Sequence, residues 1–313
     1  MVNANHALLP RPLQFFALIY IALLVESYTT NAINQEKKIA FLFLSYDQLP
    51  LEPIWRRFFE GKDKSNDLAH YTIYNHPSPN FTFPATSFFY GKEVKNRVIT
   101  KWAEWSLVTA EVSLLTAALE DPLNEWFCLI SDSCIPLVSF KRWREAFIPE
   151  SRSVINACPY DPTEMSIRRW KSHLGSDRSY WRKSGQFFVL TRKHAMIIVE
   201  EASRLHSRWL NASAPDETFM ASVIASYRLE NETTCSDGFT TAKWIGNQRR
   251  PYAYGRKEIN TDLLHNLSIS GAQHGRGFYK QCSGYKICHF TARKFAADTT
   301  DVLMQHMDNL LYE

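Results

Sequence analysis

Two continuous apolar runs constrain the fold of this chain more than any other feature. The first is KIAFLFL (38–44), and the second is WFCLISDSCIPL (126–137), which runs into a polar loop. An apolar run without polar alternation is typical of a strand that is covered on both faces of its sheet. Both segments are therefore predicted to be buried strands.

Segments with helical periodicity lie between and after these runs. The clearest is WSLVTAEVSLLTAALED (105–121), which Asp121-Pro122 ends. Strands that alternate with helices indicate an α/β fold, with a central, mostly parallel sheet and helices on both faces. Further strands are expected at 71–77, 153–159, 243–246 and 285–290, a strand followed by a helix at 185–205, and further helices at 49–61, 139–148 and from 298 onward.

Three polar loops follow predicted strands: SYDQLP (45–50), NHPSP (75–79) and SDSCIP (131–136). In open α/β sheets, ligands bind beyond the carboxyl ends of the strands. Proline and aspartate are also common in turns, so a plain connection is the alternative for each loop. GxGxxG, GxxxxGK[ST] and GxSxG do not occur in the sequence. Dinucleotide, P-loop and α/β-hydrolase sites are therefore not expected.

The N-terminal part of the chain is expected to carry a targeting signal, with a buried core helix as the alternative. Residues 13–25, after Arg11, are almost wholly apolar, a run that is short for a membrane span and typical of a signal-peptide core. A signal peptide cleaved after Ala32 and an uncleaved signal-anchor are the two alternatives, and both send the rest of the chain into the secretory lumen. We therefore expect residues 1–37 to form the signal segment and a short stalk, and residues 38–313 to form a lumenal domain.

Glycosylation motifs and cysteines agree with that address. The six cysteines permit disulfides in an oxidising compartment. Cys282 and Cys288 would close a short loop, and the pairing is otherwise left open. The net charge of +4 is small and the basic residues are scattered, so no nucleic-acid partner is expected. Predicted N-glycosylation sites are Asn80, Asn211, Asn231 and Asn266.

The stretch SAPDETFMAS (213–222) begins a predicted helix with two adjacent acids. Ser213 and Asp216 fit a capping box, and Pro215 fits the first helical turn. Glu217 is not needed for the cap and falls on the edge of the apolar stripe of this helix. A solvated surface acid and a catalytic carboxylate are the two interpretations of Glu217.

A lumenal α/β enzyme with a buried first strand suggests transfer of a sugar from a nucleotide sugar. Most such enzymes hold a metal ion on an Asp-x-Asp motif, but this sequence has none, and Asp132 in SDSCIP is a lone acid. Arginine and lysine can neutralise a diphosphate instead. Two basic clusters qualify, QRRPYAYGRK (248–257) and TARKF (291–295), with ordinary surface charge as the alternative.

These segments together resemble one family. KKIAFLFLSYDQLPLEPIWRRFFEG, YTIYNHPSP, FFYGKEV, WSLVTAEVSLLTAAL, CLISDSCIPL, WRKSGQFFVLTRKHA, APDETF and ICHFTARKFA occur in that order along the chain. The same order is found in the core-2/I-branching β-1,6-N-acetylglucosaminyltransferases, glycosyltransferase family 14, in their plant and algal form. The resemblance extends from Lys37 to the C-terminal helix and implies a GT-A-like version of the α/β fold.

The resemblance also implies an activity: an inverting, metal-independent transfer from a UDP-sugar to a glycan or glycoprotein acceptor, without a cofactor. It implies a single-pass type II protein of the Golgi membrane with a lumenal catalytic domain. A donor with N-acetylglucosamine, forming a β-1,6 branch, follows from the family name. UDP-glucuronic acid as donor and an inactive glycan-binding glycoprotein are the alternatives. A hydrolase would need a second acid opposite Glu217, and Asp216 points to a different face.

The family's roles fall on particular residues of this chain. Glu217 in APDE would be the base that takes the proton from the acceptor hydroxyl. Lys294, with Arg249 or Arg250, would hold the diphosphate. Asp132 would lie at the donor or acceptor cleft. Possible sugar contacts are Trp181, Lys183 and Gln186 of WRKSGQFF, with a core position as the alternative for the tryptophan.

Overall fold

The computed structural model describes residues 36–61, 68–159, 178–236, 238–246, 248, 250–269 and 289–312. Contacts divide the chain into Met1–Lys37 and Lys38–Glu313, and the second unit is described here. The apolar segment 13–25, Arg249, Cys282 and Cys288 lie outside the described residues. Among the helices that are described, none combines the length and the apolar character needed to cross a membrane.

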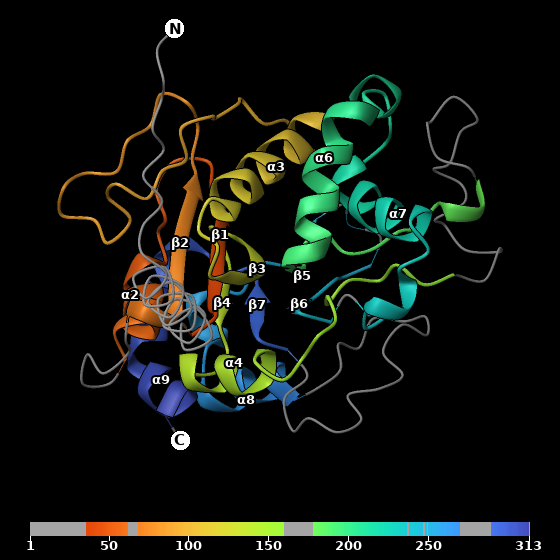
Figure 1. Cartoon of the computed structure of the whole chain (residues 1–313). Coiled ribbons are helices and arrows are strands. Elements are labelled where there is room, and N and C mark those ends of the chain that lie inside the picture. The colour runs from red at the N-terminus through yellow and green to blue at the C-terminus, as the bar shows by residue number, and fades with distance from the viewer. Residues whose placement is uncertain are drawn as a thin grey trace, which may run out of the picture. The chain divides into compact units, whose positions relative to one another are not determined.

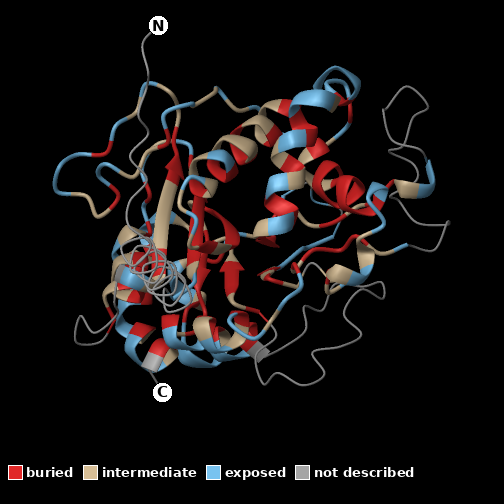
Figure 2. Ribbon diagram, viewed as in Figure 1, coloured by how far each residue is buried: buried red, intermediate tan, exposed pale blue. Residues whose placement is uncertain are grey.

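A four-stranded sheet lies at the centre of this unit (Figure 1). β1 is parallel to β2 and β3 on its two sides, and β5 is antiparallel to β3. The two long apolar strands, β1 and β3, are buried along almost their whole length (Figure 2). The sheet confirms the predicted, mostly parallel α/β architecture. In order across the sheet, the strands are β2 (Tyr71–His76), β1 (Lys38–Leu44), β3 (Asn124–Ser131) and β5 (Val189–Thr191).

Aromatic side chains fill one face of the sheet, beneath α2 (Glu52–Glu60) and α4 (Phe140–Phe147). The ring of Phe41 in β1 lies 5.7 Å from that of Phe58 in α2 and 4.9 Å from that of Trp143 in α4. Edge-on and tilted pairs of this kind contribute about 0.5–1.5 kcal/mol beyond their buried area. The C-terminal helix α9 (Thr300–Tyr312) packs on α2.

Two long helices cover the other face. α3 (Trp105–Leu119) packs on β1, β2 and β3, and α6 (Arg192–Trp209) packs on β3, β5 and α3. Side chains alternate between the faces of a strand, so Phe41 faces α2 while Ala40 and Leu42 lie on the side of α3. Helices on both faces were expected, and the packing confirms them. The short helix α7 (Phe219–Ser226) packs against α6.

A second, three-stranded sheet joins segments from distant parts of the chain. β7 (Thr291–Arg293) lies between β4 (Ile135–Pro136), to which it is antiparallel, and β6 (Thr240–Ala242), to which it is parallel. α8 (Thr261–Ile269) lies between β6 and β7 in the sequence. Single 3-10 turns complete the described elements: Leu68–His70, Arg178–Tyr180, Pro215–Glu217, Glu230–Glu232, Arg256–Glu258 and Ala297–Thr299.

Three predicted strands differ from the observed elements. The segment 153–159 contributes only isolated bridges, at Ser153 and Val154. β6 ends just before the predicted strand 243–246, and β7 begins just after 285–290, of which only the last two residues are described. The observed strands β6 and β7 are each three residues long. Their limits are therefore set by tertiary pairing rather than by an apolar pattern in the sequence.

Among the described cysteines, a disulfide links Cys158 to Cys235, with 5.2 Å between the Cα atoms. Its presence agrees with the expectation of disulfides in an oxidising compartment, and the sequence alone did not indicate the pairing. Cys128 and Cys134 are free thiols buried in the core. The bridge closes a loop with a sequence separation of 77 residues. A cross-link of this span removes many conformations from the unfolded chain.

We expect the double substitution of Cys158 and Cys235 by alanine to lower the free energy of unfolding by about 4–5 kcal/mol, from the chain-entropy model for a loop of this length. Denaturant titration of the variant and the wild type measures this difference. A reductant should destabilise the wild type more than the variant. Equal free energies for the wild type with and without reductant would contradict the expectation.

Candidate active site

Glu217 lies in a tight turn between α6 and α7. The turn, Pro215–Glu217, follows Ala214, whose φ of 48° is left-handed. The N–H of Ala214 donates to the carbonyl of Ala103 (3.2 Å), and the N–H of Ser184 donates to the carbonyl of Glu217 (2.8 Å). These two backbone bonds connect the turn to two other segments and hold Glu217 in place.

The predicted capping box at this position is wrong. Ser213 is exposed and precedes the left-handed Ala214, and no side-chain cap bond forms at the start of the turn or of α7 in this fully described stretch. The left-handed residue changes the direction of the chain between Ser213 and the turn, so the geometry of a capping box is not met. Asp216 instead lies close enough to the buried Glu111 for their charges to interact.

Lys183 is a cationic neighbour of Glu217. Its Nζ lies 3.5 Å from Oε2 of Glu217, and the two side chains are 30% and 29% exposed. A half-exposed pair of this kind contributes little to stability. The partial exposure of both side chains leaves them within reach of a ligand. The structure therefore places the predicted base next to one of the predicted sugar contacts.

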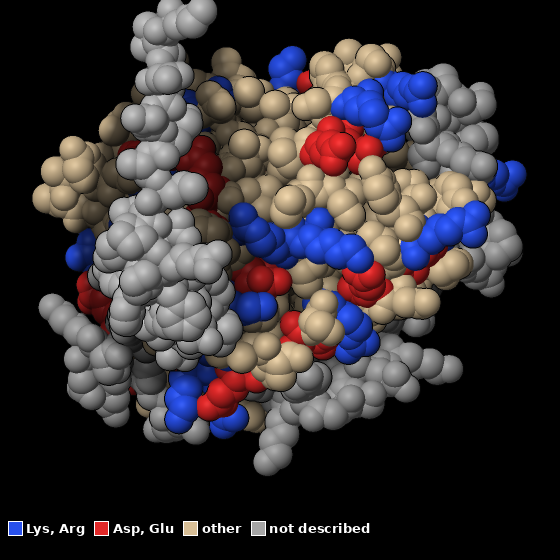
Figure 3. Space-filling view, in the orientation of Figure 1, with Lys and Arg blue, Asp and Glu red and all other residues tan. Residues whose placement is uncertain are grey.

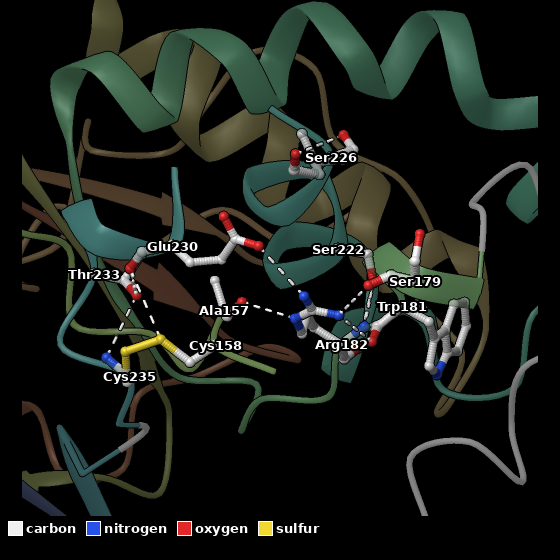
Figure 4. A network of polar contacts seen from close by, with 11 residues as sticks. Ala157, Cys158, Ser179, Trp181, Arg182, Ser222, Ser226, Glu230, Thr233 and Cys235 are labelled. Carbon is white, nitrogen blue, oxygen red and sulfur yellow. Dashed lines mark hydrogen bonds and ion pairs between the residues drawn. A yellow bond between two sulfur atoms is a disulfide. The ribbon is translucent and has the colours of Figure 1, made fainter. Parts of the chain in front are cut away.

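Arg182 anchors the segment that carries Lys183 (Figure 4). It is 5% exposed, its Nε donates to the carbonyl of Ala157 (2.9 Å), and its Nη2 lies 3.3 Å from Oε1 of Glu230. Its backbone N–H donates to Oγ of Ser222 in α7 (2.9 Å). A buried guanidinium with its hydrogen bonds satisfied fixes the segments that it joins.

The disulfide belongs to the same network (Figure 4). Cys158 directly follows Ala157, and the N–H of Cys235 donates to Oγ1 of Thr233 (3.4 Å). Thr233 Oγ1 in turn donates to the carbonyl of Glu230 (2.8 Å). The covalent bridge and the buried arginine therefore brace one region, on which the position of Lys183 depends.

A buried carboxyl group lies behind the turn. Glu111 of α3 is fully buried, and its Oε1 accepts a hydrogen bond from Nε2 of Gln186 (3.0 Å). Burial raises the pKa of Glu111 well above its usual value, the charge of Asp216 raises it further, and the bond from Gln186 lowers it. Burial therefore favours the protonated form of Glu111. Gln186, a predicted sugar contact, uses its amide N–H on this buried group.

The cations at the end of β7 lie beside the loop that follows β3, because the N–H of Phe295 donates to the carbonyl of Ser133 (3.1 Å). Burial lowers the pKa of Lys294, the neighbouring charge of Arg293 lowers it further, and Asp132 acts in the opposite direction. Arg250 is near enough to contribute to the same shift. Burial also lowers the pKa of Arg293, which Asp132 and Glu217 oppose. The interacting charges show that separate segments converge here.

The structure thus brings together Glu217, Lys183, Asp132 and Lys294, with Arg250 nearby. On the face drawn in Figure 3, basic and acidic side chains lie next to one another rather than in separate patches. Within the described part of the chain, no group of three or more His, Cys, Asp or Glu side chains is placed to hold a metal ion.

Trp181 occupies the core. It is 4% exposed, and its ring stacks on that of Trp209 with 5.0 Å between the centroids and 11° between the planes. A ring packed in this way has little surface left for a sugar, which agrees with the core alternative. Arg249, one of the predicted diphosphate ligands, lies outside the described residues.

Sequence reasoning named Arg293 only as a member of the basic cluster TARKF, without a role of its own, and it gave no site role to Glu111. Each left a signal in the sequence. Arg293 directly precedes Lys294 in TARKF, and Glu111 is the single acid within the apolar helix 105–119. A charge in the middle of an apolar helix indicates a buried polar contact.

The four predicted glycosylation sites are all exposed. Asn266 lies within α8, whereas Asn80 and Asn211 lie in turns and Asn231 in a 3-10 turn. Exposure is what attachment of a glycan requires, and the modification itself stays a prediction. Asn211 also lines a hollow between the start of α3 and the end of α6.

Comparisons with known proteins find a matching family and a curated relative. The model of the Core-2/I-Branching enzyme family matches residues 39–268. This range contains Asp132, Lys183, Glu217 and Arg250 and ends before β7. The Glycosyltransferase BC10 of Oryza sativa subsp. japonica is 33% identical over 226 residues, which cover 63% of this chain and 55% of the relative. The chain thus spans about half the length of the curated relative that it matches.

Glu111 should make the stability of the protein depend on pH. Because burial raises the native pKa of Glu111 above its usual value of about 4.5, its contribution to the free energy of unfolding is fully present below about pH 4.5. This contribution is lost as the pH rises through the native pKa. Glu111→Gln keeps an acceptor for Gln186 but cannot ionise. We expect the free energy of unfolding of this variant, relative to the wild type, to increase with pH by up to about 1.4 kcal/mol per unit.

Denaturant titrations from pH 4.5 to 8.5 measure this dependence. Glu104→Gln is the matched control, because Glu104 is 57% exposed and its replacement should leave the pH profile of the wild type unchanged. Parallel profiles for the wild type and Glu111→Gln would contradict the expectation.

Proposed function

The chain belongs to the Core-2/I-branching enzyme family, and from this membership we propose that it is a glycosyltransferase which moves a sugar from a UDP-sugar to a hydroxyl group of a glycan. One observation carries the proposal. The charges of Glu217 and of Asp132 act on the same guanidinium, that of Arg293, which directly precedes Lys294 in the chain. The proposed base and the proposed diphosphate ligand are therefore close enough to act on one substrate.

The proposed reaction is a single displacement. The acceptor oxygen attacks the anomeric carbon while the bond from this carbon to the diphosphate oxygen breaks and leaves its electron pair on UDP. The carboxylate of Glu217 takes the proton of the acceptor hydroxyl. Attack opposite to the leaving group inverts the anomeric centre. The fixed turn supports this role, because it positions Glu217 through backbone bonds.

Lys294 and Arg250 are the described candidates to neutralise the departing diphosphate, with Arg249 as a further candidate from sequence. Charge-assisted hydrogen bonds to phosphate oxygens stabilise charge as it develops. The lowered pKa of Lys294 reflects burial near other cations, and a bound diphosphate would relieve that repulsion. In this proposal, side-chain cations take the place of a metal ion.

We propose N-acetylglucosamine as the transferred sugar and a β-1,6 branch as the product, with UDP-glucuronic acid as the alternative donor. We also propose a lumenal catalytic domain in the Golgi, held by the N-terminal segment. The Cys158–Cys235 disulfide supports an oxidising compartment.

Release of UDP tests the proposal. The wild type, Glu217→Gln and a Lys183→Met variant are incubated with a panel that includes UDP-N-acetylglucosamine and UDP-glucuronic acid, with excess EDTA and a glycan acceptor mixture. We expect the wild type to turn over one donor in EDTA, and Glu217→Gln to lose about 100-fold or more in kcat because the base is absent. UDP affinity, measured by calorimetry, should be the same in Glu217→Gln and the wild type.

Turnover that requires a divalent ion would contradict the proposed role of the cations, and full activity of Glu217→Gln would contradict the proposed base. Binding of glycans without turnover of any donor would favour the glycan-binding alternative.

Lys294→Ala should act on binding of the nucleotide. Loss of one charge-assisted contact to the diphosphate is expected to weaken UDP binding by about 10- to 100-fold. Lys257→Ala is the matched control, because Lys257 is an exposed lysine of the other basic cluster. Equal UDP affinities for the Lys294 and Lys257 variants, measured by calorimetry, would show that Lys294 does not hold the diphosphate.

A further inference from the structure

Arg293 is a cation without a counter-charge in the described structure. Its side chain forms no ion pair with a described carboxylate, and its buried Nε has no hydrogen-bond partner among the described residues. Its guanidinium carbon lies 4.4 Å from the centroid of the Phe187 ring. The aromatic face supports one side of the guanidinium, as arginine stacking commonly does. The N–H groups at the edge of the Arg293 guanidinium remain able to donate to another group.

The backbone of Arg293 is held firmly. It is the last residue of β7, the central strand of the second sheet, and it pairs with Ala242 of β6. The residue before it, Ala292, is fully buried and pairs with Ile135 of β4. A side chain that starts from a fixed strand and rests on an aromatic ring has little freedom to turn toward solvent. Its direction is therefore set by the fold.

Arg293 is partly exposed, but its Nε is closed off from water. A charge in such a place is destabilising when nothing pairs with it. A guanidinium cannot escape this cost by losing its proton, because it stays protonated in proteins. The neighbouring Cys134 thiol cannot supply the charge, because burial raises its pKa. Asp132 and Glu217 act on Arg293 from beyond ion-pair distance. An arginine kept in such a place indicates a bound anion.

The two cations at the end of β7 have different neighbours. The Arg293 guanidinium stacks on Phe187, three residues after Ser184, whose N–H donates to the carbonyl of Glu217. The backbone of Lys294 instead bonds to Tyr252 and Tyr254, which follow Arg250 in the chain. In a UDP-sugar, the β-phosphate lies next to the sugar, and the anomeric carbon lies between that phosphate and the base. The cation nearer to Glu217 is therefore on the sugar side of the diphosphate.

We propose that Arg293 binds the β-phosphate of the nucleotide and stabilises the charge that develops on its departing oxygen. This inference rests on the proposed function and adds to it a cation that stabilises the oxygen on which the leaving electron pair remains. Bond breaking between the anomeric carbon and the diphosphate oxygen adds negative charge to the β-phosphate, and a donor that is already in position stabilises this charge without rearrangement. Arg293 thus contributes both to UDP binding and to kcat.

Calorimetry with uridine, UMP and UDP locates this contact. Arg293→Met keeps an apolar stem against Phe187 and removes the charge. We expect the Kd for UDP to rise about 10- to 100-fold in this variant, while the values for uridine and UMP stay within about threefold of the wild type. The Kd of Arg293→Lys for UDP should lie between those of the wild type and Arg293→Met. A lysine keeps the charge but not the two-pronged geometry of arginine. Arg142→Met is the matched control, since Arg142 of α4 is 63% exposed and pairs with Glu145, and its Kd for UDP should equal that of the wild type.

Two further measurements separate a binding role from a structural one. Thermal unfolding without ligand should give Arg293→Met a midpoint equal to or above that of the wild type, because an unpaired charge has been removed. A lowered midpoint with unchanged UDP affinity would overturn the proposal and assign Arg293 to an ion pair with an acid outside the described residues. The kcat of Arg293→Met should fall as well as its affinity for UDP. An unchanged kcat would overturn the role of Arg293 in the departure of UDP.

Failure of this inference differs from failure of the proposed function. If the wild type and Arg293→Met bind UDP equally well, only the role of Arg293 is overturned. An equal loss of UMP and UDP affinity would move the contact to the α-phosphate and overturn the assignment to the β-phosphate. A wild type that binds neither UDP nor any UDP-sugar would overturn the proposed function, and this inference with it.

Discussion

The site depends on the pairing of β4 with β7, which joins two segments that are far apart in the chain. β4 begins directly after the loop with Asp132, and β7 carries Arg293 with Lys294 next to it. The register of Ile135 with Ala292 therefore sets these cations against the end of the central strand. Closing so long a loop costs entropy, and burial of both paired residues helps to offset it.

The central fold could be predicted because its signals are local. Apolar runs of seven or more residues and one long helical stripe indicated β1, β3 and α3, and the structure has them. The second sheet gave no such signal, because its strands are two or three residues long and exist only through tertiary pairing. The capping box failed for a related reason. Its pattern was present around Ser213, but the left-handed Ala214 is fixed by a bond to Ala103, which local sequence does not reveal.

The residue types of the candidate site could be predicted from the sequence, but the contacts that position these residues could not. Glu217, Lys183 and Lys294 belong to recognisable segments, whereas the contacts that position them involve buried residues with no motif. Arg182 binds backbone carbonyls and Glu230, beside the disulfide, and the next two residues contact Glu217. No pattern of spacing predicts that an arginine will lie inside the protein with its donors satisfied by loop carbonyls. This brace becomes visible only when the segments are folded together.

Two ionisable groups of this region, Glu111 and Arg293, are costly for the fold. Glu111 is held where burial opposes its charge, and Arg293 where no described carboxylate neutralises it. Departure of a charged leaving group is stabilised by donors that are fixed before the reaction and not already paired. A loosely held arginine would find a partner or turn to solvent, so an unpaired charge requires a rigid surrounding. The disulfide, the Arg182 network and the β4–β7 pairing supply that rigidity, and the stability that they contribute allows the site to keep charges available for a ligand.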